Sequence, residues 1–126
     1  MVPLPMSVSG GKRILLVEDE PIVAIALQDM IEELGHEVVG PAFHLTRALE
    51  LAEIETIDAA ILDVNMGDGH SYGVADRLRA RGIPYLFATG YGASGLEPGH
   101  EDSLVLPKPY REAQVAAALE KLLGTA

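Results

Sequence analysis

Five short apolar runs alternate along the chain with longer stretches in which apolar residues recur three and four positions apart. Short apolar runs bounded by polar or turn residues are typical of buried strands, and the wider spacing is typical of amphipathic helices. The predicted strands cover residues 14–17, 36–39, 58–62, 83–88 and 104–106. The predicted helices cover residues 21–34, 46–55, 71–82 and 111–123. This alternation predicts one doubly wound α/β domain with a parallel sheet.

Turn residues set several of the predicted boundaries. Gly40 and Pro41 end the second strand, and residues 64–69 form a glycine-rich loop after the third strand. Ser71 stands where it would cap the third helix. The stretch 90–102 contains four glycines and one proline, so a regular helix is disfavoured there even though a parallel crossover normally contains one.

Composition narrows the class of protein. The 126 residues predict a single domain over residues 11–124, preceded by a flexible tail over 1–10 and followed by no output domain. The net charge of -10 leaves no basic face for direct nucleic-acid binding and opposes docking to an anionic membrane. Cysteine is absent, which excludes disulfides and thiolate metal sites. Since no signal peptide and no membrane-spanning run are visible, the expected location is cytoplasmic.

Polar side chains follow the carboxyl ends of four of the predicted strands. Glu18 and Asp19 follow the first, Asp63 the third, Thr89 the fourth and Lys108 the fifth. In an open parallel sheet these ends meet at one edge, so the five side chains are expected to share a crevice. Three carboxylates in one pocket repel one another unless a cation intervenes, and hard oxygen ligands suit Mg²⁺.

This set of groups is sufficient for phosphorylating an aspartate. A carboxylate is a known nucleophile for phosphoryl transfer, and the reaction needs positioning and charge neutralisation more than covalent help. Lys108 and Thr89 offer a positive charge and a hydroxyl donor for the phosphoryl oxygens. The same acidic run before a helix is also explained by the favourable charge of a helix N-terminus, which is the simpler interpretation of Glu18 and Asp19 taken alone.

Four motifs, in order, resemble the receiver domain of two-component response regulators. They are Leu16-Val17-Glu18-Asp19-Glu20, Leu62-Asp63-Val64-Asn65-Met66, Ala88-Thr89-Gly90 and Lys108-Pro109-Tyr110. The resemblance covers nearly the whole chain, from Lys12 to Leu123. It implies a flavodoxin-like five-stranded parallel sheet of order 2-1-3-4-5 with about five helices, the fourth short or irregular.

The resemblance also implies a role for each residue of the set. Asp63 is the phosphoacceptor, and Thr89 and Lys108 contact the phosphoryl group. Mg²⁺ is bound by the side chains of Asp19 and Asp63 and by the backbone carbonyl of Asn65, while Glu18 helps to hold the metal through water. The peptide bond between Lys108 and Pro109 is expected to be cis.

The resemblance further implies a signalling role and partners. The domain accepts phosphate from a sensor histidine kinase or histidine phosphotransferase and contacts a downstream signalling protein. It is expected not to be an enzyme beyond self-catalysed phosphorylation and dephosphorylation. The kinase, the output partner, the phosphoryl lifetime and the oligomeric state stay open.

The chain departs from the family pattern at Val105. An aromatic switch residue often stands three positions before the lysine, and here that position is valine. The segment from Phe87 to Tyr91 resembles single-domain receivers with a Phe-Ala-Thr-Gly signature, several of which act in alphaproteobacterial stress signalling. Tyr91 then has open roles as packing residue, cover of the phosphoryl site or partner contact.

Two other functions share part of this chemistry. One is a small-molecule phosphohydrolase with an aspartate nucleophile, although such enzymes usually carry a second Asp where this chain has Asn65, and no cap insertion is present. The other is a phosphorylation-independent scaffold with the same fold. The retention of all the key polar groups argues against it.

Overall fold

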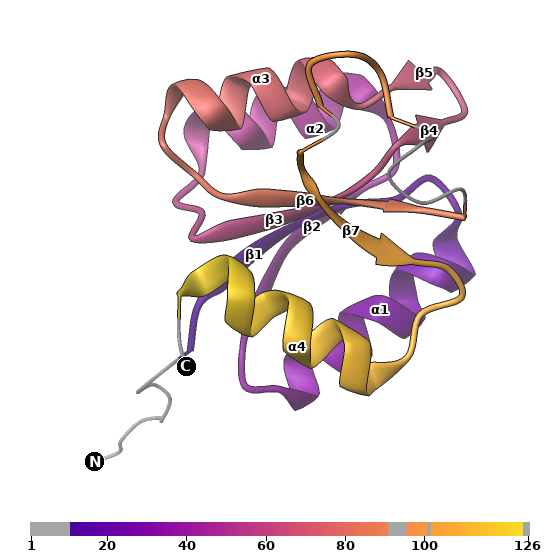
Figure 1. Ribbon diagram of the computed structural model, residues 1–126, viewed down its shortest axis with the longest axis vertical. Helices are drawn as coiled ribbons and strands as arrows, with labels where there is room; N and C mark the ends of the chain where they lie inside the picture. Colours follow the sequence, from indigo (N-terminus) through magenta and orange to yellow (C-terminus); the bar gives the residue numbers. More distant parts are fainter. Residues whose placement is uncertain (1–10, 91–95, 101, 125–126) are drawn as a thin grey trace.

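A five-stranded parallel sheet lies between two helical layers in this computed structural model, which describes residues 11–90, 96–100 and 102–124 (Figure 1). The sheet strands are β1 (Arg13–Val17), β2 (Glu37–Ala42), β3 (Ala59–Asp63), β6 (Tyr85–Thr89) and β7 (Leu104–Pro107). The helices are α1 (Pro21–Glu33), α2 (Leu45–Ile54), α3 (Tyr72–Ala80) and α4 (Glu112–Leu123). The strand order β2-β1-β3-β6-β7 confirms the predicted order 2-1-3-4-5.

Alternation along the strands divides the core into two clusters. Leu15 and Val17 of β1 pack toward α2 and α3, whereas Ile14 and Leu16 pack toward α1 and α4. All four side chains are fully buried. A strand with both faces buried reads as a continuous apolar run, which is why the run at 14–17 predicts a central strand.

The second strand does not end at Gly40 and Pro41 as predicted, but continues to Ala42. Gly40 has a φ of 99°, and the pairing with β1 shifts register between Leu15 and Val17. Proline is tolerated in a strand at a sheet edge or a bulge, and β2 is an edge strand. The extension matters for the site because the Ala42 carbonyl accepts a 3.0 Å hydrogen bond from the backbone N–H of Glu18.

The predicted loop 64–69 contains a small antiparallel hairpin, made of β4 (Asn65–Met66) and β5 (Gly69–His70). Ser71 occupies the N-cap position of α3, but the prediction that it caps the helix is wrong. Its side chain makes no capping hydrogen bond, and its buried Oγ has no hydrogen-bond partner among the described residues.

The irregular stretch before β7 agrees with the glycine-rich sequence. Residues 96–100 and 102–103 form turns and bends, and the described parts of the chain contain four helices. The predicted tail over 1–10 and Tyr91 lie outside the described residues. None of the helices within 11–90, 96–100 and 102–124 has the length and apolarity needed to cross a bilayer.

Candidate functional site

The carboxyl edge of the sheet holds a pocket of about 280 Å³, which we call the carboxyl-edge pocket. It is lined by Asp19, Glu20, Asp63, Asn65, Thr89, Gly90 and Lys108. These residues come from the ends of β1, β3 and β6, from β4, and from the residue after β7. The predicted convergence of strand-end side chains therefore occurs, and the buried Glu18 contacts the pocket residue Lys108.

Three carboxylates form the acidic part of the site. Glu18, Asp19 and Asp63 each offer an oxygen within 4.8 Å of the other two. Glu18 is fully buried and Asp63 is 5% exposed, so water screens these charges poorly. A Cβ at Gly67 would lie 3.2 Å from Asp19 Oδ2, which shows how closely the hairpin turn approaches this cluster.

Lys108 is the cation of the site. Its Nζ lies 3.1 Å from Asp63 Oδ1 and 3.4 Å from Glu18 Oε2. Its backbone N–H donates to the Thr89 carbonyl over 3.3 Å, and its peptide bond to Pro109 is cis. Lys108 thus joins the ends of β6 and β7 to the acidic cluster.

Burial and the local negative charge shift the pKa values of Asp63 and Lys108. Burial raises the pKa of Asp63 to about 7; the charge of Glu18 adds to the rise and Lys108 opposes it. Burial alone would lower the pKa of Lys108, but the carboxylates of Asp63 and Glu18 outweigh it and raise that pKa. Three carboxylates facing one ammonium form a donor set that fits a hard divalent cation such as Mg²⁺.

Tyr110 takes part in the site. The sequence indicated only a packing role for this residue and did not reveal this contact. Its hydroxyl donates a 3.2 Å hydrogen bond to Glu18 Oε2, and Lys108 Nζ lies 5.9 Å from its ring centroid. Burial first, and then the charges of Glu18 and Asp63, raise the pKa of this hydroxyl. The only sequence signal was its position two residues after the lysine. The backbone contact from Ala42 to Glu18 carries no side-chain signal at all.

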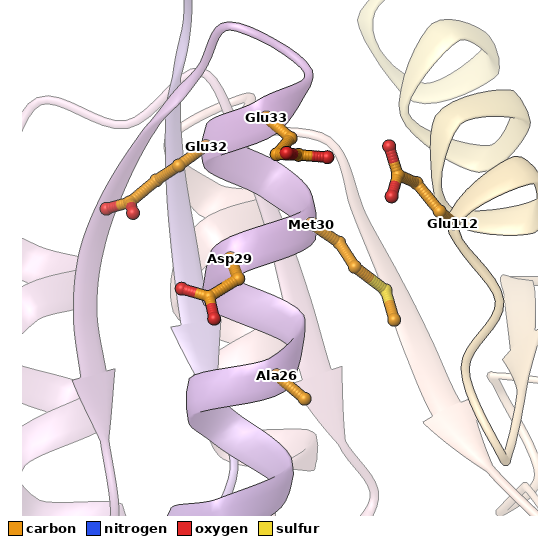
Figure 2. A pocket seen from close by; sticks show the side chains of 6 residues that line it. All are labelled: Ala26, Asp29, Met30, Glu32, Glu33 and Glu112. Atoms are coloured by element: carbon orange, nitrogen blue, oxygen red, sulfur yellow. The ribbon is translucent and has the colours of Figure 1, made fainter.

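Two further hollows lie along α1, the first beside the carboxyl-edge pocket and the second beside the first. The first, of about 500 Å³, is mostly apolar and is lined by Glu20, Ile22, Val23, Ala26, Met30, Lys108, Pro109 and Tyr110. The second, of about 640 Å³, lies between α1 and α4 and shares Ala26 and Met30 with the first. Its lining includes Asp29, Glu32 and Glu33 of α1 and Glu112 of α4, and Figure 2 shows the side chains of Glu33 and Glu112 pointing into the gap between the two helices.

Comparison with protein families finds one model that spans most of the chain. The model describes the response regulator receiver domain and matches residues 14–120. Among curated proteins, the phyllosphere-induced regulator PhyR of Methylorubrum extorquens is 34% identical over 116 residues, which cover 87% of this chain and 43% of PhyR. The chain thus spans less than half the length of that relative.

Two solved structures can be superposed on this chain over nearly the full length of both chains. SdrG from Sphingomonas melonis Fr1 is 44% identical, with a TM-score of 0.80 over 92% of this chain and 99% of SdrG. SdrG has also been solved in a BeF3-activated conformation. The receiver domain of the sensor histidine kinase PA1611 from Pseudomonas aeruginosa is 25% identical, with a TM-score of 0.76 over 90% and 98% of the two chains. That structure has magnesium in its active-site cleft.

Proposed function

This chain belongs to the receiver-domain family of response regulators, and we propose that it is an Mg²⁺-dependent phosphoacceptor whose Asp63 accepts a phosphoryl group. The observation that carries the proposal is the position of Asp63. Its buried carboxylate lies within 4.8 Å of oxygens of Glu18 and Asp19 and 3.1 Å from Lys108 Nζ. The donor is a sensor histidine kinase or a histidine phosphotransferase.

Four residues would hold the metal: Glu18 through water, Asp19 and Asp63 through their side chains, and Asn65 through its backbone carbonyl. When bound, Mg²⁺ neutralises the carboxylates and the phosphoryl oxygens. The donor set supports this assignment because three oxygen ligands lie within 4.8 Å of one another without a histidine or thiolate among them. Asn65 lines the same pocket at the start of β4.

The transfer step uses this chain's own groups as follows. An oxygen of the Asp63 carboxylate attacks phosphorus, a new O–P bond forms, and the P–N bond of the donor phosphohistidine breaks with its electron pair returning to the imidazole. Lys108 moves from its carboxylate partners to a phosphoryl oxygen. The Thr89 hydroxyl donates to another. Their contribution is positioning and charge neutralisation, which dominate phosphoryl transfer.

The surface beside the pocket supports a protein as donor. Ile22 is 83% exposed at the rim of the apolar hollow, which also includes Lys108 and Pro109. Exposed apolar surface next to a reaction site is typical of protein contact surfaces. The acidic hollow between α1 and α4, where Glu33 and Glu112 face each other in Figure 2, adjoins this surface, so a donor helix with apolar residues followed by basic ones would match it.

Phosphorylation would act as a charge switch. The aspartyl phosphate adds roughly -1.5 to -2 charge at the carboxyl edge of the sheet. Thr89 and Lys108 stand at the ends of β6 and β7, so their attraction to the phosphoryl group would shift these strands and the segment between them. A downstream signalling protein would bind the shifted face.

The proposal is tested by incubating the protein with acetyl phosphate and Mg²⁺ and measuring its intact mass. We expect one added phosphoryl group, none with Asp63→Asn, and a normal adduct with Asp76→Asn, an exposed acid on α3. A chelator should abolish the adduct. Failure of the wild-type protein to be labelled, or equal labelling of Asp63→Asn, would contradict the proposal.

The same protein samples separate the two alternative functions. Repeated turnover of a generic phosphate ester that is lost in Asp63→Asn would indicate a phosphohydrolase. Binding of a partner that ignores both acetyl phosphate and Asp63→Asn would indicate a scaffold. We expect neither result.

A further inference from the structure

Three aromatic rings from separate parts of the chain meet on the α3 side of β6. Tyr72 begins α3, Phe87 lies in β6, and His100 belongs to the irregular segment before β7. The ring centroids of Tyr72 and His100 are 4.6 Å apart. Phe87 meets Tyr72 at 5.4 Å and His100 at 5.6 Å, both edge-on. We call these three residues the aromatic pin.

The pin holds the segment before β7 against the body of the domain. His100 is 9% exposed, and Leu96 of the same segment is 7% exposed. The backbone N–H of Glu97 donates a 2.9 Å hydrogen bond to the Tyr72 hydroxyl. This segment has no helix in its described part, so ring packing, the burial of Leu96 and the hydrogen bond from Glu97 to Tyr72 fix it against the domain in place of regular structure.

The fit of His100 is incomplete in a way that suits a contact that opens. Its buried Nδ1 has no hydrogen-bond partner in the described part of the chain. A buried polar atom left unpaired costs free energy, so the closed pin is held by stacking against a local penalty. Contacts of this kind can differ between two states of similar free energy.

The pin lies beside the position where the aromatic switch residue is missing. Val105 of β7 is the register partner of Phe87, and both face the same core cluster. The rings that pack against Phe87 come from Tyr72, Tyr85 and His100, and none comes from position 105. The segment before β7 thereby supplies what the strand lacks.

Both groups that would contact the phosphoryl group are connected to the pin. Thr89 stands two residues after Phe87 on β6, so the two side chains share one face of the strand. Lys108 is connected to the pin through β7. The Ser103 N–H, directly before β7, donates to the His100 carbonyl over 3.1 Å. That strand leads into Lys108, whose N–H donates to the Thr89 carbonyl.

We propose that the aromatic pin is the switch of this receiver: it is closed in the unphosphorylated protein and opens when Asp63 is phosphorylated. Movement of Thr89 and Lys108 toward the phosphoryl group shifts Phe87 and β7, which separates His100 from Tyr72. The start of α3 and residues 96–100 then present a new surface. This inference rests on the proposed function of Asp63.

The Glu97 amide provides a direct measurement, because its N–H is bonded to the Tyr72 hydroxyl. Hydrogen exchange of the full chain is followed by NMR with Mg²⁺ alone and with Mg²⁺ plus BeF3⁻, a phosphoryl stand-in. We expect Glu97 exchange to rise by about fivefold or more with BeF3⁻, together with shifted His100 ring resonances. If the amides next to Asp63 show that the site is saturated with BeF3⁻ while the Glu97 and His100 signals stay unchanged, the proposed role of the pin is wrong and the phosphoacceptor proposal is unaffected. Absence of any BeF3⁻ response in wild type would instead count against the phosphoacceptor proposal.

Substitutions in the aromatic pin test the coupling between the pin and the phosphorylation site in the reverse direction. Because thermodynamic linkage is reciprocal, a change in the pin should alter the affinity for BeF3⁻. If the closed pin opposes the phosphorylated state, His100→Ala should tighten BeF3⁻ binding by about fivefold or more. His100→Phe keeps three rings and should stay near wild type, as should His44→Ala at an exposed histidine. Tyr72→Phe keeps the ring but removes the acceptor, so it should raise Glu97 exchange without BeF3⁻. Equal BeF3⁻ affinity for wild type and a folded His100→Ala would overturn the inference.

Discussion

The two ends of the sheet treat charge in opposite ways. At the amino end, the backbone N–H of Arg13 donates to Asp58 Oδ2 over 2.8 Å, and the Arg13 guanidinium pairs with Glu55 at 3.1 Å. At the carboxyl end, Asp63 faces Glu18 and shares its one ammonium. At the amino end, Asp58 and Glu55 each accept from a donor of Arg13, whereas at the carboxyl end Glu18 and Asp63 share the single ammonium of Lys108.

The difference separates stability from function within one sheet. Paired acids lower the free energy of the folded state, and crowded acids raise it unless a ligand supplies charge. The carboxyl end therefore favours binding of a divalent cation. Sites that carry unfavourable charge in the free protein are commonly functional sites. The comparison predicts opposite outcomes for acid removal at the two ends.

The largest effect is expected for Asp63→Asn. Phosphorylation by acetyl phosphate should be lost completely, because the amide is not a nucleophile for this reaction. In the absence of metal at neutral pH, the same variant should be more stable than wild type by about 1–2 kcal/mol, since it removes crowding charge. Intact-mass analysis and urea denaturation in a chelator measure the two effects. A clear loss of stability in the chelator would contradict the charge argument.

A second large effect is expected for Lys108→Ala, which leaves Asp63 and Glu18 without their cation. We expect a loss of about 2 kcal/mol in metal-free protein, less than for a fully buried pair because Lys108 is 27% exposed. Mg²⁺ should restore part of this loss. Urea denaturation with and without Mg²⁺ measures it, and Lys121→Ala, a cation of the last turn of α4, serves as control. An equal loss in both variants would show that Lys108 has no special role.

Removing an acid at the amino end of the sheet should have effects opposite to those of Asp63→Asn: a loss of stability and normal phosphorylation. Asp58→Ala deletes the acceptor of the Arg13 N–H and should destabilise the fold by about 1.5–3 kcal/mol, the range for a hydrogen bond to a charged group. Acetyl phosphate labelling of Asp63 should stay normal in folded protein, because the change lies at the other end of the sheet. Denaturation and intact-mass analysis on one sample test both expectations. Slower labelling with unchanged stability would reverse the comparison.

Strand-end chemistry was the part of the molecule that the sequence predicted best. Apolar runs located the strands, and strand ends of a parallel sheet must share an edge, so Asp63, Thr89 and Lys108 could be brought together without coordinates. The chemical role of each of these residues stays a proposal. The alternation of strands and helices was predicted equally well, because a parallel sheet with two apolar faces requires helices packed on both of them.

What the sequence missed depends on register and side-chain reach. Pro41 looked like a strand end, since a bulge at an edge strand cannot be read from residue types. Ser71 looked like a cap, yet its buried hydroxyl makes no capping hydrogen bond. The role of Tyr110 depends on a contact 92 residues away in sequence. The packing of His100 against Tyr72 lies in a segment without periodicity, where no pattern indicates burial.

The smallest effect concerns His36, whose Nδ1 accepts the backbone N–H of Lys12 at the amino end of the sheet. Burial and then the charge of Lys12 lower the pKa of His36, while Asp58 acts in the opposite direction. The unfolded chain, with an ordinary histidine pKa of about 6.5, therefore binds a proton more readily than the folded protein. This contribution to stability is complete above about pH 6.5 and is lost as the pH falls through the lowered pKa of the folded protein.

We expect wild type to lose more stability than His36→Gln between pH 7.5 and pH 5.5, as measured by urea denaturation at both values, with His44→Gln as the control. Identical pH dependence in wild type and His36→Gln would show that this paired end of the sheet does not respond to protons.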